Sequence, residues 1–394
     1  MSQSPEMVII LSDGIRGHLF QSRGIAGWLA KYTGAEIVEF QVPKISGFMK
    51  FYLLKLQGRR LPSMNKEELH CWFAKSGGHS LVGECQLHLQ KNKVDSRRVL
   101  FISAGSGAAA FNVALSKYLG SKSCALMTPS FIGTDPFDFA VVPLHDKPKG
   151  EANVLSTLGA PNSIFPEKLC EASKELSSIY PPESHRRWAL LIGGDDANYC
   201  ISSIWMHKNI SPIIRAAQEK NIDLYITTSR RTSAEAEQAL IEVAGESPQV
   251  KMLLLASQDP MNPVPGMMGL CNRVFCTEDS VSMVSEAVTA GHRVILMRVE
   301  HRQGIKKVLQ TCMKPFYSWG ISRFNTLFDA LKEKRCLVEY SAHCLDELDG
   351  DYQSSVTDFN EARRAAFWMT EKLVERGHEV LIISAGGKMT SLFH

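Results

Sequence analysis

Residues 277–287 read TEDSVSMVSEA. This stretch follows a short apolar run at 274–276, and the change of pattern predicts a strand that turns into a helix ending at Gly291. Valines at helical spacing form one face of that helix, while Ser282 and Glu286, four residues apart, share the opposite face. A strand followed directly by such a helix is the repeating unit of an α/β fold.

The start of this helix is a candidate anion site. A turn built from acidic and hydroxyl residues ahead of the helix, ending at Ser280, leaves backbone N–H groups and the positive end of the helix dipole exposed. Nucleotide phosphates suit that position, with Glu286 one turn further along to accept a hydrogen bond from a sugar hydroxyl. An ordinary helix cap followed by a solvated glutamate explains the same residues. The neighbouring loops therefore have to distinguish a ligand site from a plain helix cap.

Composition sets the broad class of the protein. A chain of 394 residues suits two domains, and its net charge of +3 is too small to indicate nucleic acid as a partner. No apolar run reaches the roughly 18 residues that a membrane span needs, and the N-terminus does not resemble a signal peptide. The ten cysteines contain no CxxC pair, which favours reduced thiols in a cytoplasmic protein over a disulfide framework or a zinc site.

Both halves of the chain alternate short apolar runs with helix-length segments. Runs that are apolar throughout predict strands of parallel sheets covered on both faces. The expected strands cover residues 7–11, 35–40, 99–103, 124–127, 137–142, 188–192, 224–227, 251–256, 274–276 and 294–299. We therefore expect an α/β protein with two Rossmann-like domains whose parallel sheets face each other across a cleft.

Three segments follow from this pattern. Residues 1–180 form an N-terminal Rossmann-like domain with an insertion at 44–77, and a Pro-rich polar stretch at its end suits a linker. Residues 181–345 form a C-terminal Rossmann-like domain. Residues 346–394 form a helix and a tail, which we expect to pack back across the domains.

Ligands of open parallel sheets bind beyond the carboxyl ends of the strands. After the first strand come Asp13, Gly14, Gly17 and His18, and Gly105 lies in a Gly-Ser-Gly turn after the third. Glycines in these turns allow close approach of a ligand, but tight turns alone also explain them. His18 is a candidate general base because the pKa of histidine lies near neutrality.

Further polar groups follow two other strands. Asp146, beside His145 after the fifth strand, competes with Asp13 and His18 for the role of base. Ser229, Arg230 and Arg231 follow a strand of the second half. Guanidinium groups suit diphosphate oxygens, although one of the two arginines could instead cap a helix or pair with a neighbouring glutamate.

The segment 44–60 within the insertion is basic and aromatic. A segment of this kind can lie on an anionic membrane surface. A helix that packs on the core, with lysines that reach outward to solvent, is the alternative.

Several of these segments, taken in order, resemble the mitochondrial-fission Elm family, whose bacterial members are assigned to the glycosyltransferases. The resemblance covers roughly residues 7–330. The segments that carry it are DGxxGHxxQ at 13–21, ISAG at 102–105, FDxxVVPxHD at 137–146, LIGG at 191–194, TTSRRT at 227–232 and residues 277–286.

The resemblance implies a glycosyltransferase of the B-type fold, with the nucleotide-sugar donor held mainly by the C-terminal half. On that analogy, the donor is surrounded by Gly193, Gly194, Ser229, Arg230, Ser280, Ser282, Met283 and Glu286. Asp13, His18, His145 and Asp146 face the acceptor, a cell-surface glycan or a lipid-linked molecule. Folds of this type imply neither a metal site nor a bound cofactor, because the nucleotide sugar is a substrate.

The chain departs from the family at Asp195 and Asp196, which follow the Gly-Gly turn where a proline, serine or lysine is expected. We read them as a loop and not as a metal site. Two carboxylates close to a diphosphate would repel it, so they put the binding of a donor in question.

Three functions stay open on the sequence. The first is a metal-independent glycosyltransferase that moves a sugar to a surface glycan or a lipid-linked acceptor. The second is a non-catalytic adaptor that recruits a dynamin-like GTPase in mitochondrial fission, a role associated with plant relatives. The third is a nucleotide-sugar epimerase of the same fold, which acts on the donor alone.

Overall fold

A computed structural model gives the structure of the chain. It describes residues 4–302, 322–341, 345 and 359–375, apart from 197 and 246. The contacts between residues divide the chain into two compact units: residues 1–163 with 360–394, and residues 164–359. Most of the predicted C-terminal tail, residues 376–394, lies outside the described residues.

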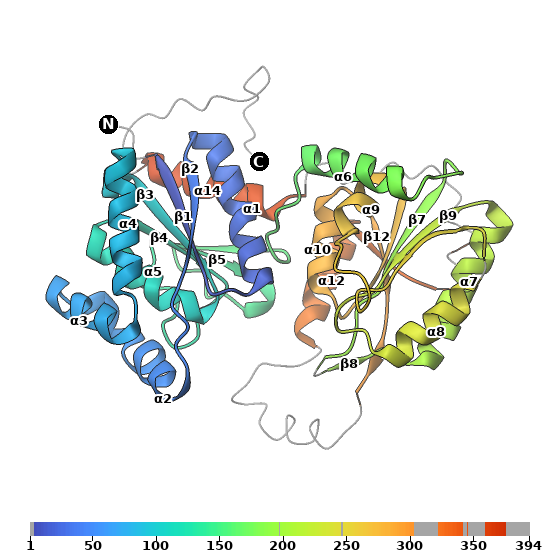
Figure 1. The fold of residues 1–394 in the computed structure, drawn as a ribbon, viewed down its shortest axis with the longest axis horizontal. Coiled ribbons are helices and arrows are strands. Elements are labelled where there is room, and N and C mark those ends of the chain that lie inside the picture. Colours follow the sequence, from blue (N-terminus) through green and yellow to red (C-terminus); the bar gives the residue numbers. More distant parts are fainter. Residues whose placement is uncertain are drawn as a thin grey trace. The chain divides into compact units, whose positions relative to one another are not determined.

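The first unit is built on a six-stranded parallel sheet with the order β2-β1-β3-β4-β5-β6 (Figure 1). Its strands are β1 (Met7–Ser12), β2 (Glu36–Gln41), β3 (Val99–Ala104), β4 (Lys122–Leu126), β5 (Phe139–Pro143) and β6 (Val154–Thr157). Its helices are α1 (Arg16–Thr33), α2 (Gly47–Lys50), α3 (Lys66–Ser76), α4 (His79–Asn92), α5 (Gly105–Leu119) and α14 (Glu361–Glu375). Shorter helical segments are η1 (Phe51–Leu56), η2 (Gly58–Ser63), η3 (Ser96–Arg98) and η4 (Leu144–Asp146).

Burial explains why these runs are strands. In β1 the first five residues, 7–11, are all buried, since helices cover both faces of the central part of the sheet. In β2, at the edge, exposed and half-buried residues follow one another with no buried position. The first core therefore has two layers, one on each face of the sheet, and both are rich in aliphatic and aromatic side chains.

The second unit repeats this plan with the order β10-β9-β7-β11-β12-β14, again all parallel. Its strands are β7 (Arg187–Leu191), β9 (Asp223–Thr227), β10 (Val250–Leu254), β11 (Arg273–Thr277), β12 (Val294–Met297) and β14 (Leu337–Glu339). A separate antiparallel pair joins β8 (Tyr199–Cys200) to β13 (Glu300–His301). Its helices are α6 (Pro166–Ile179), α7 (Ser203–Lys220), α8 (Ala234–Ala244), α9 (Val264–Leu270), α10 (Val281–Thr289) and α12 (Ser322–Glu333).

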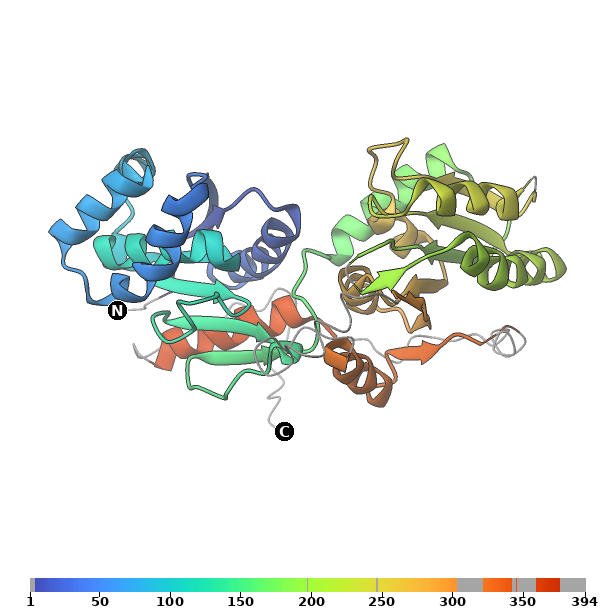
Figure 2. The same ribbon diagram turned by 90° about the horizontal axis from the view of Figure 1, so that it is seen from below.

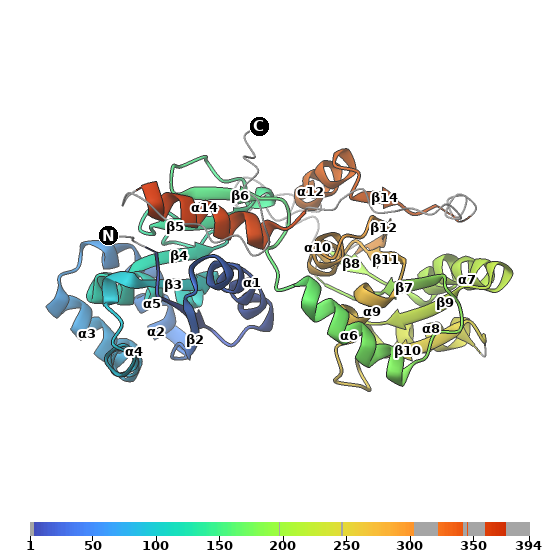
Figure 3. The ribbon, with the colours of Figure 1, turned by 90° about the horizontal axis from the view of Figure 1, so that it is seen from above.

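The helices α6 and α14 belong to other units than the sequence predicted. Figure 3 shows α6 beside α9 in the second unit, so the boundary between the units falls at residues 163 and 164, ahead of the Pro-rich stretch near residue 180. Figure 2 shows α14, in red, against the first sheet, where it packs on α1 and β6. The described part of the C-terminal segment thus completes the first unit.

All ten predicted strands are present, and the predicted α/β class with two parallel-sheet, Rossmann-like units is confirmed. The sequence missed the two-residue strands β8 and β13, and also β6 and β14, which are short edge strands with few buried residues. None of the helices in the described ranges has the length and apolarity that crossing a bilayer requires. The eight cysteines that the structure describes are free thiols.

Candidate functional site

The helix that begins after β11 has an open N-terminus. In α10 the N-cap residue, Ser280, makes no side-chain capping bond, and the first turn carries no acidic residue. The backbone N–H groups of the first turn have no acceptors within their own helix. This helix end, with the positive end of its dipole, lies at the carboxyl edge of the second sheet, as the sequence predicted.

Glu286 lies one turn into the same helix and is half-buried. No hydrogen bond or ion pair engages its carboxylate among the residues that the structure describes. Burial raises the pKa of this carboxyl from its ordinary value of 4.5 to about 7. Ser282, which precedes it by four residues, is exposed, and Met283 is half-buried. An acidic group without a described partner beside a helix N-terminus is an arrangement that a hydroxyl-bearing anionic ligand would complete.

Asp279 connects the loops that follow three neighbouring strands. Its side chain is fully buried, and Oδ2 accepts hydrogen bonds from the Gly194 N–H at 2.8 Å and from Arg231 Nη2 at 2.9 Å. The Thr277 hydroxyl accepts a bond from the Gly193 N–H at 2.7 Å. Burial raises the pKa of Asp279, while bonds from Thr277, Gly194 and Arg231 oppose that rise. The three loops therefore form one interlocked unit under the N-terminus of α10.

Gly193 and Gly194 are required in these interlocked loops because other atoms lie too close for a side chain. A Cβ on Gly193 would lie 2.1 Å from Asp279 Oδ2, and a Cβ on Gly194 would lie 2.2 Å from the backbone carbonyl carbon of Arg231. Both distances are far below contact distance. The structure thus assigns these predicted donor-binding glycines a packing role first.

The two neighbouring arginines have different surroundings. The guanidinium group of Arg231 is engaged by neighbouring loops, since Nη1 donates to the Gly194 carbonyl at 3.2 Å in addition to the bond with Asp279. Ser229 belongs to the turn itself, because its hydroxyl accepts the Arg231 N–H at 3.2 Å. Arg230 is exposed, and no described residue pairs with its guanidinium group. Of the two, Arg230 is the one whose charge is available to a ligand.

The Asp195-Asp196 pair is a structural turn, as we read it, and its charges are neutralised within the protein. The Asp195 carboxylate accepts the Ile201 N–H at 3.1 Å and pairs with Arg302 Nη2 at 2.6 Å. Asp196 Oδ1 accepts the N–H groups of residues 198 and 199 at 2.6 and 2.8 Å. Asp196 Oδ2 also lies 3.8 Å from Arg231 Nη1. Both carboxylates are thus engaged by groups of the protein itself, and the expected repulsion of a diphosphate stays a prediction.

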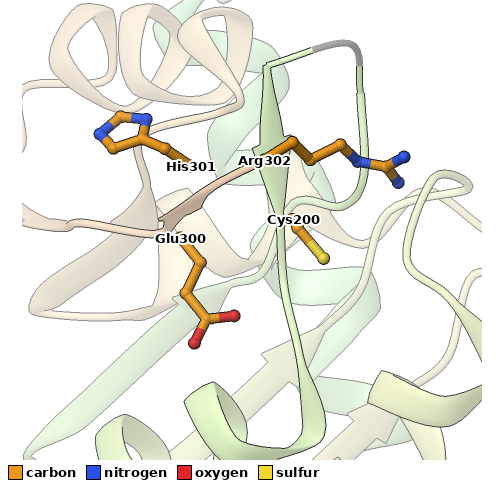
Figure 4. A pocket seen from close by; sticks show the side chains of 4 residues that line it. All are labelled: Cys200, Glu300, His301 and Arg302. Atoms are coloured by element: carbon orange, nitrogen blue, oxygen red, sulfur yellow. The ribbon is translucent and has the colours of Figure 1, made fainter. Parts of the chain in front are cut away.

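Arg302 also borders a cavity of about 750 Å³ at the β8–β13 pair. Its described lining is Cys200, Glu300, His301 and Arg302 (Figure 4). Figure 4 shows Glu300 and His301 projecting to opposite sides of β13, as successive residues of a strand do. These side chains do not converge on one point, so the cavity shows no built ligand site.

Sequence reasoning missed Glu278, which is 1 % exposed. Its carboxylate accepts Arg298 Nη1 at 2.6 Å and the Val299 N–H at 2.9 Å, and so ties the end of β11 to the end of β12. An acidic residue directly after a buried strand, with an arginine after the next strand, was the available signal.

In the first unit, Asp13 and His18 form a dyad after β1. Asp13 Oδ2 lies 2.9 Å from His18 Nδ1, and Asp13 Oδ1 accepts the Ile15 N–H at 3.1 Å. Gly14 permits this turn, with φ at +83°. The imidazole lies on Gly105, where a Cβ would come within 2.4 Å of His18 Cε1. Asp13 thus holds His18 through Nδ1 and leaves Nε2 as the second ring nitrogen.

The remaining predicted residues of the first unit lie in two places. Gly17 has no heavy atom within 4 Å of the position of a Cβ. His145 and Asp146 lie in η4, directly after β5 at the same carboxyl edge as His18, and His145 Nε2 is 3.8 Å from Asp146 Oδ1. The loops after β1, β3 and β5 thus bring the predicted polar residues of the first unit to one edge of its sheet.

Comparisons with known proteins agree with this architecture. A family model described as "Mitochondrial fission ELM1" matches residues 16–373. The UDP-GlcNAc 2-epimerase of Methanocaldococcus jannaschii superimposes with a TM-score of 0.51 at 12% identity, covering 94% of this chain and 99% of that one. Acinetobacter baumannii MurG gives 0.41 at 12% identity, covering 94% and 95%. A search of curated proteins finds no match. At these identities the superpositions show the fold alone, which is that of B-type glycosyltransferases and epimerases.

Proposed function

The chain belongs to the mitochondrial fission ELM1 family, and from this premise we propose that it is a glycosyltransferase that uses a nucleotide-sugar donor without a metal ion. The observation that carries the proposal is the open N-terminus of α10 with the unpartnered Glu286 one turn behind it. Anions bind at such helix ends, and Glu286 adds an acceptor for a hydroxyl group. A nucleotide sugar combines both chemistries in one molecule.

We propose specific roles for the residues of the second unit. The N–H groups of residues 281–283 would hold the donor diphosphate, and Arg230 would supply a positive charge beside it. Glu286 would accept a hydrogen bond from a ribose or sugar hydroxyl. As the bond to the sugar breaks, negative charge grows on the leaving diphosphate, and these fixed donors would stabilise it. The interlocked loops around Asp279 would hold these hydrogen-bond donors in place before the substrate binds.

For the acceptor we propose His18 as the general base. Its Nε2 would remove the proton of the attacking hydroxyl, and Asp13 would hold the ring and stabilise the positive charge that forms on it. The pair His145 and Asp146 would contact the acceptor at the same edge of the first sheet. A glycan or a lipid-linked hydroxyl is the proposed acceptor. The free thiols among the described residues favour a cytoplasmic location.

Calorimetry with uridine, guanosine, cytidine and adenosine diphosphates and their sugars tests the donor site. We expect one of them to bind, and Glu286→Ala to weaken that binding about tenfold through loss of a hydrogen bond. Glu219→Ala, at an exposed position of α7, is the matched control and should bind as the native chain does. Failure of every nucleotide to bind would remove the basis of the proposal.

The rate of the slow hydrolysis of the donor, measured as release of the nucleoside diphosphate, tests His18 as the general base. His18→Asn should lower the rate about a hundredfold or more, while donor affinity stays unchanged. Two alternatives give different results. An epimerase would return an altered sugar still attached to its nucleotide. The adaptor suggested by the family's description would bind no nucleotide and would keep its role in fission after His18→Asn.

A further inference from the structure

An apolar group of side chains is exposed on the short helical segment after β2. Phe48 is 76% exposed, the highest value of any large apolar side chain among the described residues. Met49, Tyr52 and Leu56 are 44%, 37% and 53% exposed. These four residues, which we call the 48–56 patch, belong to α2 and η1 at one end of the first unit (Figure 1). Large apolar groups clustered on a surface mark an interaction site.

Buried side chains of the same segment anchor the 48–56 patch to the first unit. Leu53 and Leu54, in the same segment, are buried in the core of the first unit, at 0% and 8% exposed. The rings of Phe48 and Tyr52 stack with their centroids 6.4 Å apart and an interplanar angle of 14°. Residues 51–56 form a π-helix, a rare geometry that is frequent at functional sites. The alternative of a wholly core-packing helix therefore accounts for only part of the segment.

The charged residues of the segment that carries the patch all have one sign. Residues 44–60 contain five basic residues and no acidic one. Lys44, Arg59 and Arg60 are exposed. Arg59 Nε also donates to the Phe131 carbonyl at 2.6 Å, which brings a further aromatic residue, 46% exposed, to the same region. Within residues 44–60 the exposed apolar groups are thus accompanied only by cations, a combination that complements a surface that is anionic outside and apolar within.

We propose that the 48–56 patch docks on an anionic lipid bilayer, with the aromatic and aliphatic side chains in the interface and the basic residues on the headgroups. The described helices cannot span a bilayer, so the contact is peripheral. A protein partner fits less well, because protein interfaces usually mix both signs of charge at the rim. The segment follows the carboxyl end of β2, the edge of the sheet that also carries His18, so docking would bring that edge close to lipid.

Co-sedimentation with vesicles tests this, using the full chain and phosphatidylcholine with or without phosphatidylglycerol. We expect binding to the anionic vesicles only, weakening as salt rises. Phe48→Ser should lower the partition coefficient about tenfold, and Arg60→Glu by a similar factor. Ile204→Ser, which removes a side chain that is 73% exposed on α7, and Lys208→Glu on the same helix are the matched controls and should change it little.

Four outcomes would overturn the proposal. The first is failure of the native chain to sediment with anionic vesicles, and the second is equal binding to neutral ones. The third is a loss of binding in the controls as large as that in the patch variants. The fourth is a Phe48→Ser variant that keeps its vesicle binding and instead changes its oligomeric state in sedimentation velocity, which would make the patch a contact between copies of the chain. Thermal unfolding of each variant establishes that it is folded, and nucleotide binding, measured separately, tests the proposed catalytic function independently.

Discussion

Gly193 and Gly194 lie where neighbouring loops of the second unit leave no room for a side chain. The resemblance to the Elm family implied that both glycines surround the nucleotide-sugar donor. The structure gives a different first reason: the Asp279 carboxylate and the backbone at Arg231 occupy the space. A glycine in the sequence indicates that another group lies close to the backbone, but only the tertiary fold shows which group that is.

Gly193→Ala is expected to lower the free energy of unfolding by about 2 kcal/mol or more, because the added methyl group overlaps Asp279 Oδ2. Gly83→Ala is the control: this exposed helical glycine of α4 has no heavy atom within 4 Å of a Cβ. There the substitution should raise stability by up to about 1 kcal/mol through helix propensity. Urea unfolding measures both. Equal effects at the two positions would contradict the packing role of Gly193.

Glu286 should make stability depend on pH. Its pKa in the folded protein is about 7, above the ordinary value of 4.5. Between pH 4.5 and pH 7 the folded state therefore keeps a proton that the unfolded state has released. Stability therefore falls as pH rises from about 4.5 to 7, by up to about 3 kcal/mol. Urea unfolding at pH 5 and pH 8 tests this. Glu286→Gln should remove that difference and raise stability at pH 8; an unchanged pH dependence would show that the carboxyl is not perturbed.

At the scale of elements, α10 combines two properties that usually exclude each other. Its N-terminus is set into the protein on the buried turn 277–280, yet it lacks a side-chain cap and an acidic first turn. Most helices satisfy these N–H groups with their own side chains. The sequence predicted the helix and its start from periodicity, since both are local properties. The absent cap depends on side-chain orientation, which only the structure shows.

Ser282→Asp separates the effect of α10 on stability from its proposed role in binding a nucleotide. A carboxylate in the first turn of the helix should stabilise the protein by about 0.5 kcal/mol through the helix dipole. The same charge would occupy the anion site and repel a diphosphate, so nucleotide affinity should fall about tenfold or more. Ser282→Asn, of equal size and neutral, should keep most of the affinity. Calorimetry and thermal unfolding measure the two effects, and unchanged binding by the aspartate variant would move the anion site elsewhere.

At the scale of the molecule, the chain returns to its first unit after completing the second. Buried residues of α14, among them Ala366 and Met369, belong to one of the first unit's two core layers. Helical periodicity predicted this helix and its apolar face. It could not assign the helix to a unit, because the partner surface on α1 lies more than 300 residues earlier in the chain.

Met369→Ala should lower the stability of the first unit alone, by about 3 kcal/mol, because it leaves a cavity in that core. Glu371→Ala, at an exposed position of the same helix, should change stability by less than about 0.5 kcal/mol. Hydrogen exchange resolved by residue distinguishes the units. Equal loss of protection in both would contradict the division at residues 163 and 164.

The sequence by itself determined the class of fold, the ten main strands and the edge of each sheet where polar residues gather. These features follow from hydrophobic periodicity and from the direction of parallel strands, which are local. The tertiary structure alone decided which charges remain available. Asp195 and Arg231 form ion pairs with partners distant in sequence, while Glu286 and Arg230 have none among the described residues. Pairing depends on distances across the fold, and a residue's type does not reveal whether its charge is already satisfied.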